Sequence, residues 1–330
     1  MVYIYKKEIA GKPRYYLRAS VRKGARVLVK DIAYLGDCAS KIQKALDSLD
    51  DYRQDIRKAH THLQKAINTH FWLEKAQEKK LKKNAYLGSV QLEVCACQLH
   101  FVKQFLKKNQ KTQNEILTQF SVDFSYNTTS IEGNTITLDQ ARKYLLRGLT
   151  PPDKTLREIH DLQNTQTVFL QWDSFSITHD SIRDLHKQLI KHIDERTGYR
   201  NEDVRVFRSR FDATPAKFVQ TDMQLLIDWY NKNKKTLHPF VLACLFHHKF
   251  EKIHPFMDGN GRTGRMLLNI ILLQNKYPPL IVENKMRLQY LRFLSDADRA
   301  QITSMESKFY RPLVEFLGKE LVSQYWNIFL

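Results

Sequence analysis

The fold is decided by the stretch His254-Pro255-Phe256-Met257-Asp258-Gly259-Asn260-Gly261-Arg262-Thr263-Gly264-Arg265. Apolar runs flank it on both sides, and each predicts a buried helix: Phe240 to Phe250 and Met266 to Leu273. The glycines and the asparagine between the runs predict a tight loop that leads into a helix N-terminus. Such an end presents free backbone N–H groups and a partial positive charge. The stretch therefore predicts an anion site between two buried helices.

The side chains of this stretch point to phosphate chemistry. Arg262 and Arg265 are three residues apart, so they share one helix face, and their forked guanidinium groups match phosphate oxygens. Asp258 offers the oxygen ligand that Mg²⁺ accepts beside phosphates. His254 can exchange a proton near neutral pH. Any one of these residues alone would favour an ordinary helix-loop-helix turn with solvated arginines, whereas their combination favours a functional site.

The stretch resembles the signature of the Fic (Fido) family, H-P-F-x-[D/E]-G-N-G-R-x-x-R, and matches every specified position. The resemblance implies a protein adenylyltransferase that uses ATP as co-substrate and Mg²⁺ as cofactor, with a target-protein hydroxyl as acceptor. It implies His254 as the general base and Asp258 as the metal ligand. The nucleotide-binding residues would be Gly259, Asn260, Gly261, Arg262, Thr263, Gly264 and Arg265. A kinase-like variant of the family replaces the glycines, which are intact here.

A second motif lies in Phe124 to Asn134. Its helix is predicted to stop at Gly133, which leaves Glu132 in a last turn where the helix dipole disfavours an anion. The segment resembles the inhibitory-helix motif of the same family, [S/T]-x-x-x-E-[G/N], at Thr128, Glu132 and Gly133. The resemblance implies an inhibitory helix over about 120–133, with Glu132 pairing with Arg265 so that this arginine cannot clamp the γ-phosphate. Glu132 could instead position a water for the reverse, de-AMPylating reaction.

The tripeptide His238-Pro239-Phe240 repeats the start of the main stretch, but Val241-Leu242 follow it and no glycine or arginine. It therefore predicts only a helix start. His247 and His248 lie within the predicted buried helix and are interpreted as structural histidines. A metal cluster of these histidines with His254 and Asp258 is the weaker alternative, because the glycine-rich pattern favours phosphate.

Residues 204–219 are predicted to form a hairpin, since Val204, Val206 and Phe207 alternate with polar residues before a helix from Asp222 to Asn231. The resemblance implies a flap at which the target protein docks by pairing its backbone with the hairpin edge. An ordinary surface hairpin is the alternative. The resemblance also places Tyr290 beside the adenine, whereas Asp298 stands where the family often has Asn.

The N-terminal segment differs from the rest of the chain. Three β-prone runs within residues 2–36 predict a small antiparallel sheet that ends near Gly36. Its many basic residues and interleaved tyrosines (Tyr3, Tyr5, Tyr15 and Tyr16) suit a nucleic-acid surface. An accessory sheet with a solvated basic face is the alternative. The rival function is therefore a nucleic-acid-binding regulator that keeps the helical core as a nucleotide sensor.

The composition sets the broad class. The chain has 330 residues, 42% hydrophobic and 27% charged, with a net charge of +18. We expect a mainly α fold: a sheet domain (1–36), a helical arm (37–112) and a Fic-type domain with its flap (113–330). The four cysteines show no zinc spacing, and neither a membrane span nor a signal peptide is evident. A cytoplasmic protein is expected, and the sequence leaves a homo-oligomer open.

Overall fold

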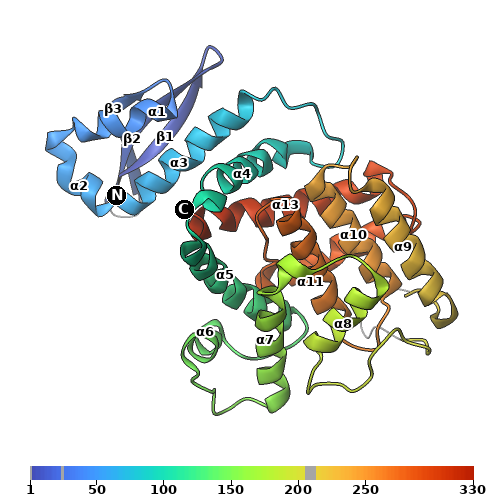
Figure 1. Cartoon of the computed structure of the whole chain (residues 1–330). Coiled ribbons are helices and arrows are strands. Elements are labelled where there is room, and N and C mark those ends of the chain that lie inside the picture. The colour runs from blue at the N-terminus through green and yellow to red at the C-terminus, as the bar shows by residue number, and fades with distance from the viewer. Residues whose placement is uncertain (1, 24–25, 205–212) are drawn as a thin grey trace. The chain divides into compact units, whose positions relative to one another are not determined.

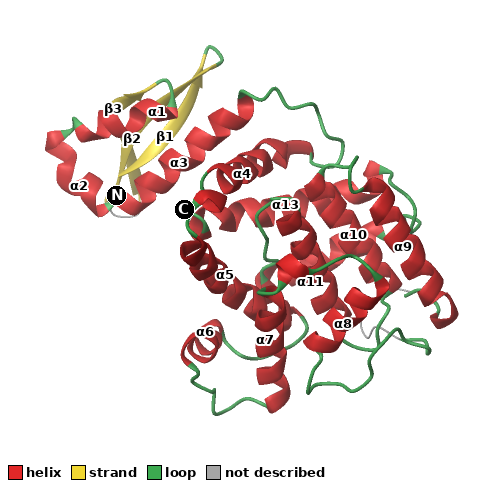
Figure 2. Cartoon of the chain, viewed as in Figure 1, coloured by secondary structure: helices red, strands yellow, loops and turns green. Residues whose placement is uncertain are grey.

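The structure is a computed structural model that describes residues 2–23, 26–204 and 213–330. It is mainly helical with one small sheet, as predicted (Figures 1 and 2). The chain divides into two compact units, each described here by itself. The first unit runs to Lys82 and includes Leu92–His100; the second comprises Lys83–Gln91 and Phe101–Phe329. Among the described residues, no helix combines the length and apolarity needed to cross a membrane.

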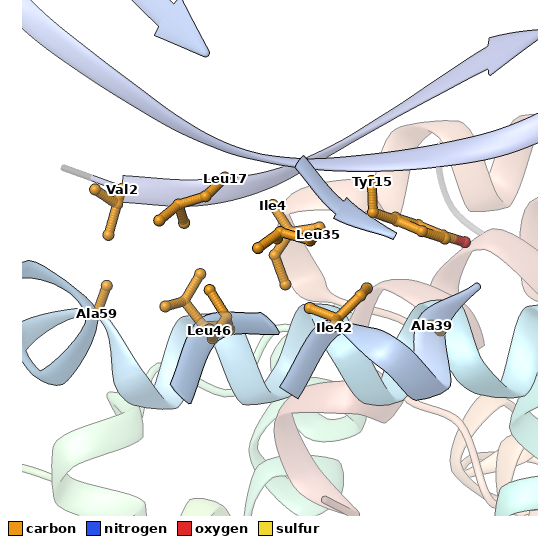
Figure 3. Close-up of a cluster of buried hydrophobic side chains, with 10 residues drawn as sticks. Val2, Ile4, Tyr15, Leu17, Leu35, Ala39, Ile42, Leu46 and Ala59 are labelled. Carbon is orange, nitrogen blue, oxygen red and sulfur yellow. The ribbon is translucent and has the colours of Figure 1, made fainter. Parts of the chain in front are cut away.

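The first unit is a sheet covered by helices on one face. Strands β1 (Val2–Ile9), β2 (Lys12–Lys23) and β3 (Arg26–Gly36) pair antiparallel in the order β1-β2-β3, which confirms the predicted sheet. The helices are α1 (Ala39–Asp47), α2 (Arg53–Lys58) and α3 (His60–Gln77). Figure 3 shows sheet side chains such as Ile4 and Leu17 pointing toward Ile42 and Leu46 of α1. Residues 39–77, expected as part of an arm, therefore share their core with the sheet.

The second unit is a helical assembly. Helix α4 spans Gln91–Lys103, and its residues Leu92–His100 belong to the first unit. The remaining helices are α5 (Gln110–Ile131), α6 (Leu138–Arg147), α7 (Leu156–Phe169), α8 (His179–Leu189), α9 (Val219–Asn233), α10 (Pro239–Ile253), α11 (Asn260–Gln274), α12 (Arg287–Ala297) and α13 (Ser307–Ile328). The predicted N-caps Thr137 and Thr178 are present. The hydroxyl of each accepts a hydrogen bond from the backbone N–H three residues further along the chain.

Helices α10 and α11 form the centre of the second unit (Figure 1). Every residue from Phe240 to Phe250 is buried, and so is every residue from Arg262 to Leu273. A helix that is buried on every side is stable only inside a core: α9 and α13 pack on α10, and α5, α7 and α8 pack on α11. The prediction of two buried helices on either side of the signature stretch is confirmed.

The predicted hairpin over 204–219 is wrong at its C-terminal end, and its residues 205–212 lie outside the described part of the chain. Ala216–Phe218 form a 3₁₀ turn and Val219 already begins α9. Pro215 fixes φ at −55°, and the N–H of Ala216 donates to the Asp203 carboxylate at 2.7 Å. The N–H of Ala216 thus donates to a side chain, whereas in a hairpin it would donate to a carbonyl of the paired strand.

Candidate active site

The signature stretch begins where α10 ends. His254 is the C-cap of α10 in the left-handed conformation, with φ 52° and ψ 59°. Five residues later Gly259 takes φ +76° as the N-cap of α11. A Cβ at Gly259 would also lie 3.0 Å from the Ile190 side chain, so both backbone and space require glycine there. The two left-handed residues fold the stretch between α10 and α11 into the tight turn that the sequence predicted.

Two buried side chains hold the loop in shape. Asn260 accepts a hydrogen bond from the N–H of Phe256 at 2.8 Å and donates to the carbonyl of Phe256, also at 2.8 Å. Its amide is therefore used to brace the loop. His186 of α8 donates from Nε2 to the Asp258 carbonyl at 2.9 Å and stacks on the Phe256 ring with centroids 3.6 Å apart. Burial lowers the pKa of His186 to about 4, so it stays neutral.

Arg200 anchors the loop from the other side, and its guanidinium is fully buried. Its Nε donates to the His254 carbonyl at 2.8 Å, and its backbone N–H donates to the Pro255 carbonyl at 2.9 Å. Other guanidinium nitrogens donate to the carbonyls of Glu202 and Thr214. Arg200 thus joins the His254 turn to both flanks of residues 205–212. Sequence reasoning missed His186 and Arg200, because neither belongs to a motif and both act on backbone carbonyls.

The His254 imidazole is largely shielded from water, and this burial lowers its pKa below the ordinary value of histidine. The ring is therefore neutral at pH 7 and able to accept a proton. The left-handed conformation of His254 and the hydrogen bond from Arg200 to its carbonyl both fix its backbone, so a residue outside the signature helps to position this imidazole.

Arg262 and Asp258 belong to one ion-pair network. Arg262 lies against the buried Asp161 of α7 and is 3.3 Å from Asp258. Asp258 also accepts from Arg157 at 2.7 Å and from the N–H of Gly259 at 2.6 Å. The Arg157 side chain is 63% exposed, so its pair with Asp258 is a weak surface bridge. Asp161 and Arg157 lie about a hundred residues before the signature, and no sequence signal joins them to it.

Arg265 forms the pair predicted from the second motif. Its guanidinium donates to the Glu132 carboxylate at 2.6 Å, to the Thr128 hydroxyl at 2.6 Å and to the Thr128 carbonyl at 3.0 Å. Helix α5 ends at Ile131, Glu132 is its C-cap, and Gly133 follows with φ +105°. The Glu132 carboxylate lies over the first turn of α11, because a Cβ at Gly261 would be only 2.1 Å from its Oε1.

The remaining predicted residues, Thr263, Gly264 and Tyr290, are buried. Thr263 donates from its hydroxyl to the Gly259 carbonyl at 2.8 Å. Gly264 faces Glu251 of α10, since a Cβ there would lie 2.3 Å from Glu251 Oε1. Tyr290 is fully buried under Arg265, and its hydroxyl is 2.6 Å from His247 Nε2.

The two histidines of α10 contact other side chains of the protein, as expected of structural histidines. His248 pairs with Asp298 at 2.9 Å, and His247 contacts Tyr290. Both histidines are buried. In the described ranges, no group of three His, Cys, Asp or Glu residues is arranged to hold a metal ion. A metal here would therefore depend on oxygen atoms brought by a ligand.

The first turn of α11 forms an anion-binding site, which we call the cradle, and the Glu132 carboxylate lies over it. The first amides of α11, those of Asn260, Gly261 and Arg262, have no acceptor within their helix. Arg262 and Arg265 rise from the same first turns, and His254 stands at the entrance of the loop. Such a site can hold a polyphosphate and place a neutral imidazole beside it.

Comparison with known proteins agrees with this geometry. The model of the Fic/DOC family matches residues 176–272. The protein adenylyltransferase fic-1 of Caenorhabditis elegans is 30% identical over 204 residues, 59% of this chain and 39% of its own length. The protein adenylyltransferase Fic of Nematostella vectensis is 31% identical over 202 residues, 59% of this chain and 45% of its own length. The chain thus spans less than half the length of these relatives.

The fold has solved counterparts as well. A Fic family protein from Desulfovibrio desulfuricans superimposes with a TM-score of 0.61 and 26% identity, covering 75% of each chain. The overall fold of this part of the chain is therefore shared with a solved structure.

Proposed function

We propose that this chain, whose residues 176–272 match the Fic/DOC family model, belongs to that family and transfers AMP from ATP to a Ser, Thr or Tyr hydroxyl of a target protein. The observation that carries the proposal is the first turn of α11, where open amides, two arginines and the His254 loop converge. Relatives that match over 59% of this chain are named protein adenylyltransferases, which supports the same chemistry.

His254 is the proposed general base. Its burial keeps the imidazole neutral, so a ring nitrogen takes the proton of the target hydroxyl. The hydroxyl oxygen then forms a bond to the α-phosphorus of ATP, while the bond from that phosphorus to the bridging oxygen breaks and pyrophosphate leaves. Most of the acceleration comes from positioning and charge stabilisation, because phosphoryl-type transfer needs little covalent help.

The cradle would hold the polyphosphate of ATP. The amides of Asn260, Gly261 and Arg262 would donate to phosphate oxygens, and Gly261 leaves room for their approach, whereas the N–H of Gly259 already donates to the Asp258 carboxylate. Arg262, held by Asp161, and Arg265 would bind the β- and γ-phosphates. Asn260 and Thr263 serve this cradle by fixing the loop backbone, and Tyr290 supports Arg265 from below.

Asp258 fits a magnesium ion as a single protein ligand. Mg²⁺ in phosphate sites usually takes one or two carboxylates and completes its shell with phosphate oxygens and water. Asp258 is one-third exposed, and its exposed partner Arg157 can be displaced at little cost. When bound, the ion would neutralise charge that develops on the phosphates.

Glu132 is the proposed brake. Its pair with Arg265 occupies the arginine required for the γ-phosphate, and its carboxylate lies at Gly261, where a phosphate would approach. ATP would then bind without its productive contacts. The Glu132 side chain is 41% exposed, so an oxygen is also open to a water molecule. The reverse, de-AMPylating reaction from the same site is therefore the second candidate.

The target protein is proposed to dock beside residues 204–219, as in the family this chain resembles. Arg200 supports this position, because it links the carbonyl groups of Glu202 and Thr214 to the His254 turn. A peptide bound along this segment would be held next to the base.

Labelled ATP with purified full-length variants tests the function and the brake. Glu132→Gly is expected to raise self-labelling by roughly 5- to 150-fold, the range of ordinary coupling free energies. The matched control is Glu132→Gly combined with His254→Ala, which should remove the label. Equal labelling by wild type and Glu132→Gly would refute the brake. Absence of labelling by every variant, with release of AMP from a modified protein by wild type alone, would favour the reverse reaction.

A further inference from the structure

The Arg157 side chain lies on the carboxylate that is proposed to hold magnesium, and the steps of AMP transfer leave it without a role. Its Nη2 donates to Asp258 Oδ2 at 2.7 Å. The other oxygen, Asp258 Oδ1, accepts from the N–H of Gly259 at 2.6 Å and is 3.3 Å from Arg262. Oδ1 is therefore engaged with the loop and the first turn of α11, whereas Oδ2 is paired with Arg157.

The two arginines at Asp258 differ in how easily each can leave it. The Arg262 side chain is 4% exposed and also pairs with the buried Asp161, so it is fixed in the site. The Arg157 side chain is 63% exposed. An exposed side chain exchanges an ion pair for water at little cost. Arg157 is therefore the partner of Asp258 that another cation can displace.

The backbone of Arg157 is fixed beside the signature stretch. Thr155 caps α7 and forms a reciprocal capping box with Glu158. The Glu158 carboxylate also accepts from the N–H and the hydroxyl of Thr135, and the Glu158 carbonyl accepts from Asn134. The first turn of α7 is thus bonded to the segment that follows α5. A change of partner by Arg157 then requires only rotation of its side chain.

A second carboxylate, Asp194, lies within electrostatic reach of Arg157. Hydrogen bonds from Arg196 lower the pKa of Asp194 to about 2, and the charge of Arg157 adds to the same shift. The distances from the Arg196 guanidinium to the two carboxylate oxygens are 2.6 to 3.2 Å. Asp194 therefore gives the Arg157 guanidinium a negative environment after it leaves Asp258.

We propose that Arg157 competes with Mg²⁺ for Asp258 and so sets how strongly the metal contributes to nucleotide binding. This inference rests on the proposed function, in which Asp258 is the metal ligand. A guanidinium at Asp258 Oδ2 excludes a metal ion from that oxygen, because two cations there repel each other. Arg157 must leave before Asp258 can bind the ion. It acts through Asp258 and is a positioning residue.

Binding of α,β-methylene-ATP, an analogue that cannot transfer AMP, tests the competition without any chemistry. Calorimetry on the full-length Glu132→Gly protein gives the Kd in EDTA and the Kd with Mg²⁺ in excess. The ratio of these two constants measures what the metal contributes to binding. Arg157→Gln should raise this ratio about two- to fivefold, the usual contribution of an exposed ion pair.

Two further variants separate the position of Arg157 from its charge. Arg157→Lys keeps the positive charge at this position and should give a ratio close to that of the parent protein. The matched control is Arg142→Gln, which removes a 52% exposed arginine from its pair with Asp123 and should leave the ratio unchanged. The effect of Arg157→Gln should shrink between about 50 mM and about 500 mM salt, because salt screens exposed ion pairs.

The failure of the competition and the failure of the proposed function give different results. An unchanged or lower ratio in Arg157→Gln, with the analogue still bound, would overturn the competition and leave the proposed function standing. An equal rise of the ratio in Arg142→Gln would overturn it as well, because total charge would then explain the effect. Absence of analogue binding by every one of these proteins, each with an intact thermal transition, would overturn the proposed function and the competition together.

Discussion

The same tripeptide, His-Pro-Phe, occurs at both ends of α10, and its two copies behave differently. His238 is the N-cap of α10, with φ −57°, and Pro239 begins the helix. His254 is the C-cap, with φ 52° and ψ 59°. After the first copy the chain continues as buried helix; after the second it turns through Gly259 into α11. The tripeptide therefore fits either end of a helix, and the residues that follow it decide the chemistry.

The environments of the two histidines are alike in polarity. His238 Nε2 is 3.2 Å from the Tyr277 hydroxyl, and burial lowers its pKa to about 4. Burial lowers the pKa of His254 as well. Both rings are neutral at pH 7, so a shifted pKa alone does not mark a catalytic base. The difference is that only His254 adjoins the open amides of α11 and the signature arginines.

The largest expected effect separates the two copies directly. In the Glu132→Gly background, His254→Ala should lower the initial rate of AMP transfer by about 10²- to 10⁴-fold, the usual contribution of a general base. His238→Ala should leave the rate within about twofold, because the hydrogen-bond partner of the His238 side chain is Tyr277, which lies outside the signature. Initial rates with labelled ATP measure both, and thermal unfolding of each variant verifies the fold. A comparable loss of rate in His238→Ala would contradict the comparison.

A smaller effect is expected from substitution of Gly261. The first copy of the tripeptide, at His238, is followed by no corresponding glycine. Gly261→Ala would place a Cβ 2.1 Å from Glu132 Oε1, so it should displace the brake. It should also obstruct the approach of phosphate to the helix amides, which would raise the KM for ATP at least about tenfold in the Glu132→Gly background. Self-labelling by the single variant should therefore stay below that of Glu132→Gly. Equal labelling by the two single variants would mean that Gly261 serves only to make room for Glu132.

The sequence predicted the parts of this site whose signal is local. Helices α10 and α11 and the glycine turn follow from apolar runs and spacing within a few residues. The Glu132–Arg265 pair joins residues 133 positions apart and is predicted only by the resemblance of two motifs to a known family. The contacts of Arg200, His186 and Asp161 could not be predicted, because they bind loop carbonyls or a buried arginine from separate helices and loops. The predicted hairpin is wrong at Ala216, because the backbone N–H of this residue donates to the Asp203 carboxylate and needs no acceptor in a paired strand.

The C-terminal end of α10 also contains a buried carboxylate, Glu251. Glu251 lies in the final turn, where the helix dipole disfavours an anion, and its Oε1 is buried without a hydrogen-bond partner among the described residues. Burial raises the pKa of Glu251 to about 8, although Arg265 opposes the shift and Glu132 and Asp298 add to it. His247, 3.9 Å away, has a pKa lowered by burial to about 3, so it brings no positive charge.

The smallest expected effect is therefore on how the melting temperature of the protein changes with pH. The folded pKa of Glu251 lies above the unfolded value of about 4.3, so the folded state retains a proton that the unfolded chain releases. Its contribution to stability is complete below the unfolded pKa and is lost as pH rises toward 8. Glu251→Gln cannot ionise, so its Tm should fall less than that of wild type between pH 6 and 9, by at least about 4 °C. Glu78→Gln, at an exposed carboxylate, is the matched control and should follow wild type at both pH values. Parallel curves for wild type and Glu251→Gln would show that Glu251 is already ionised at pH 6, and that the C-terminal end of α10 holds an anion there.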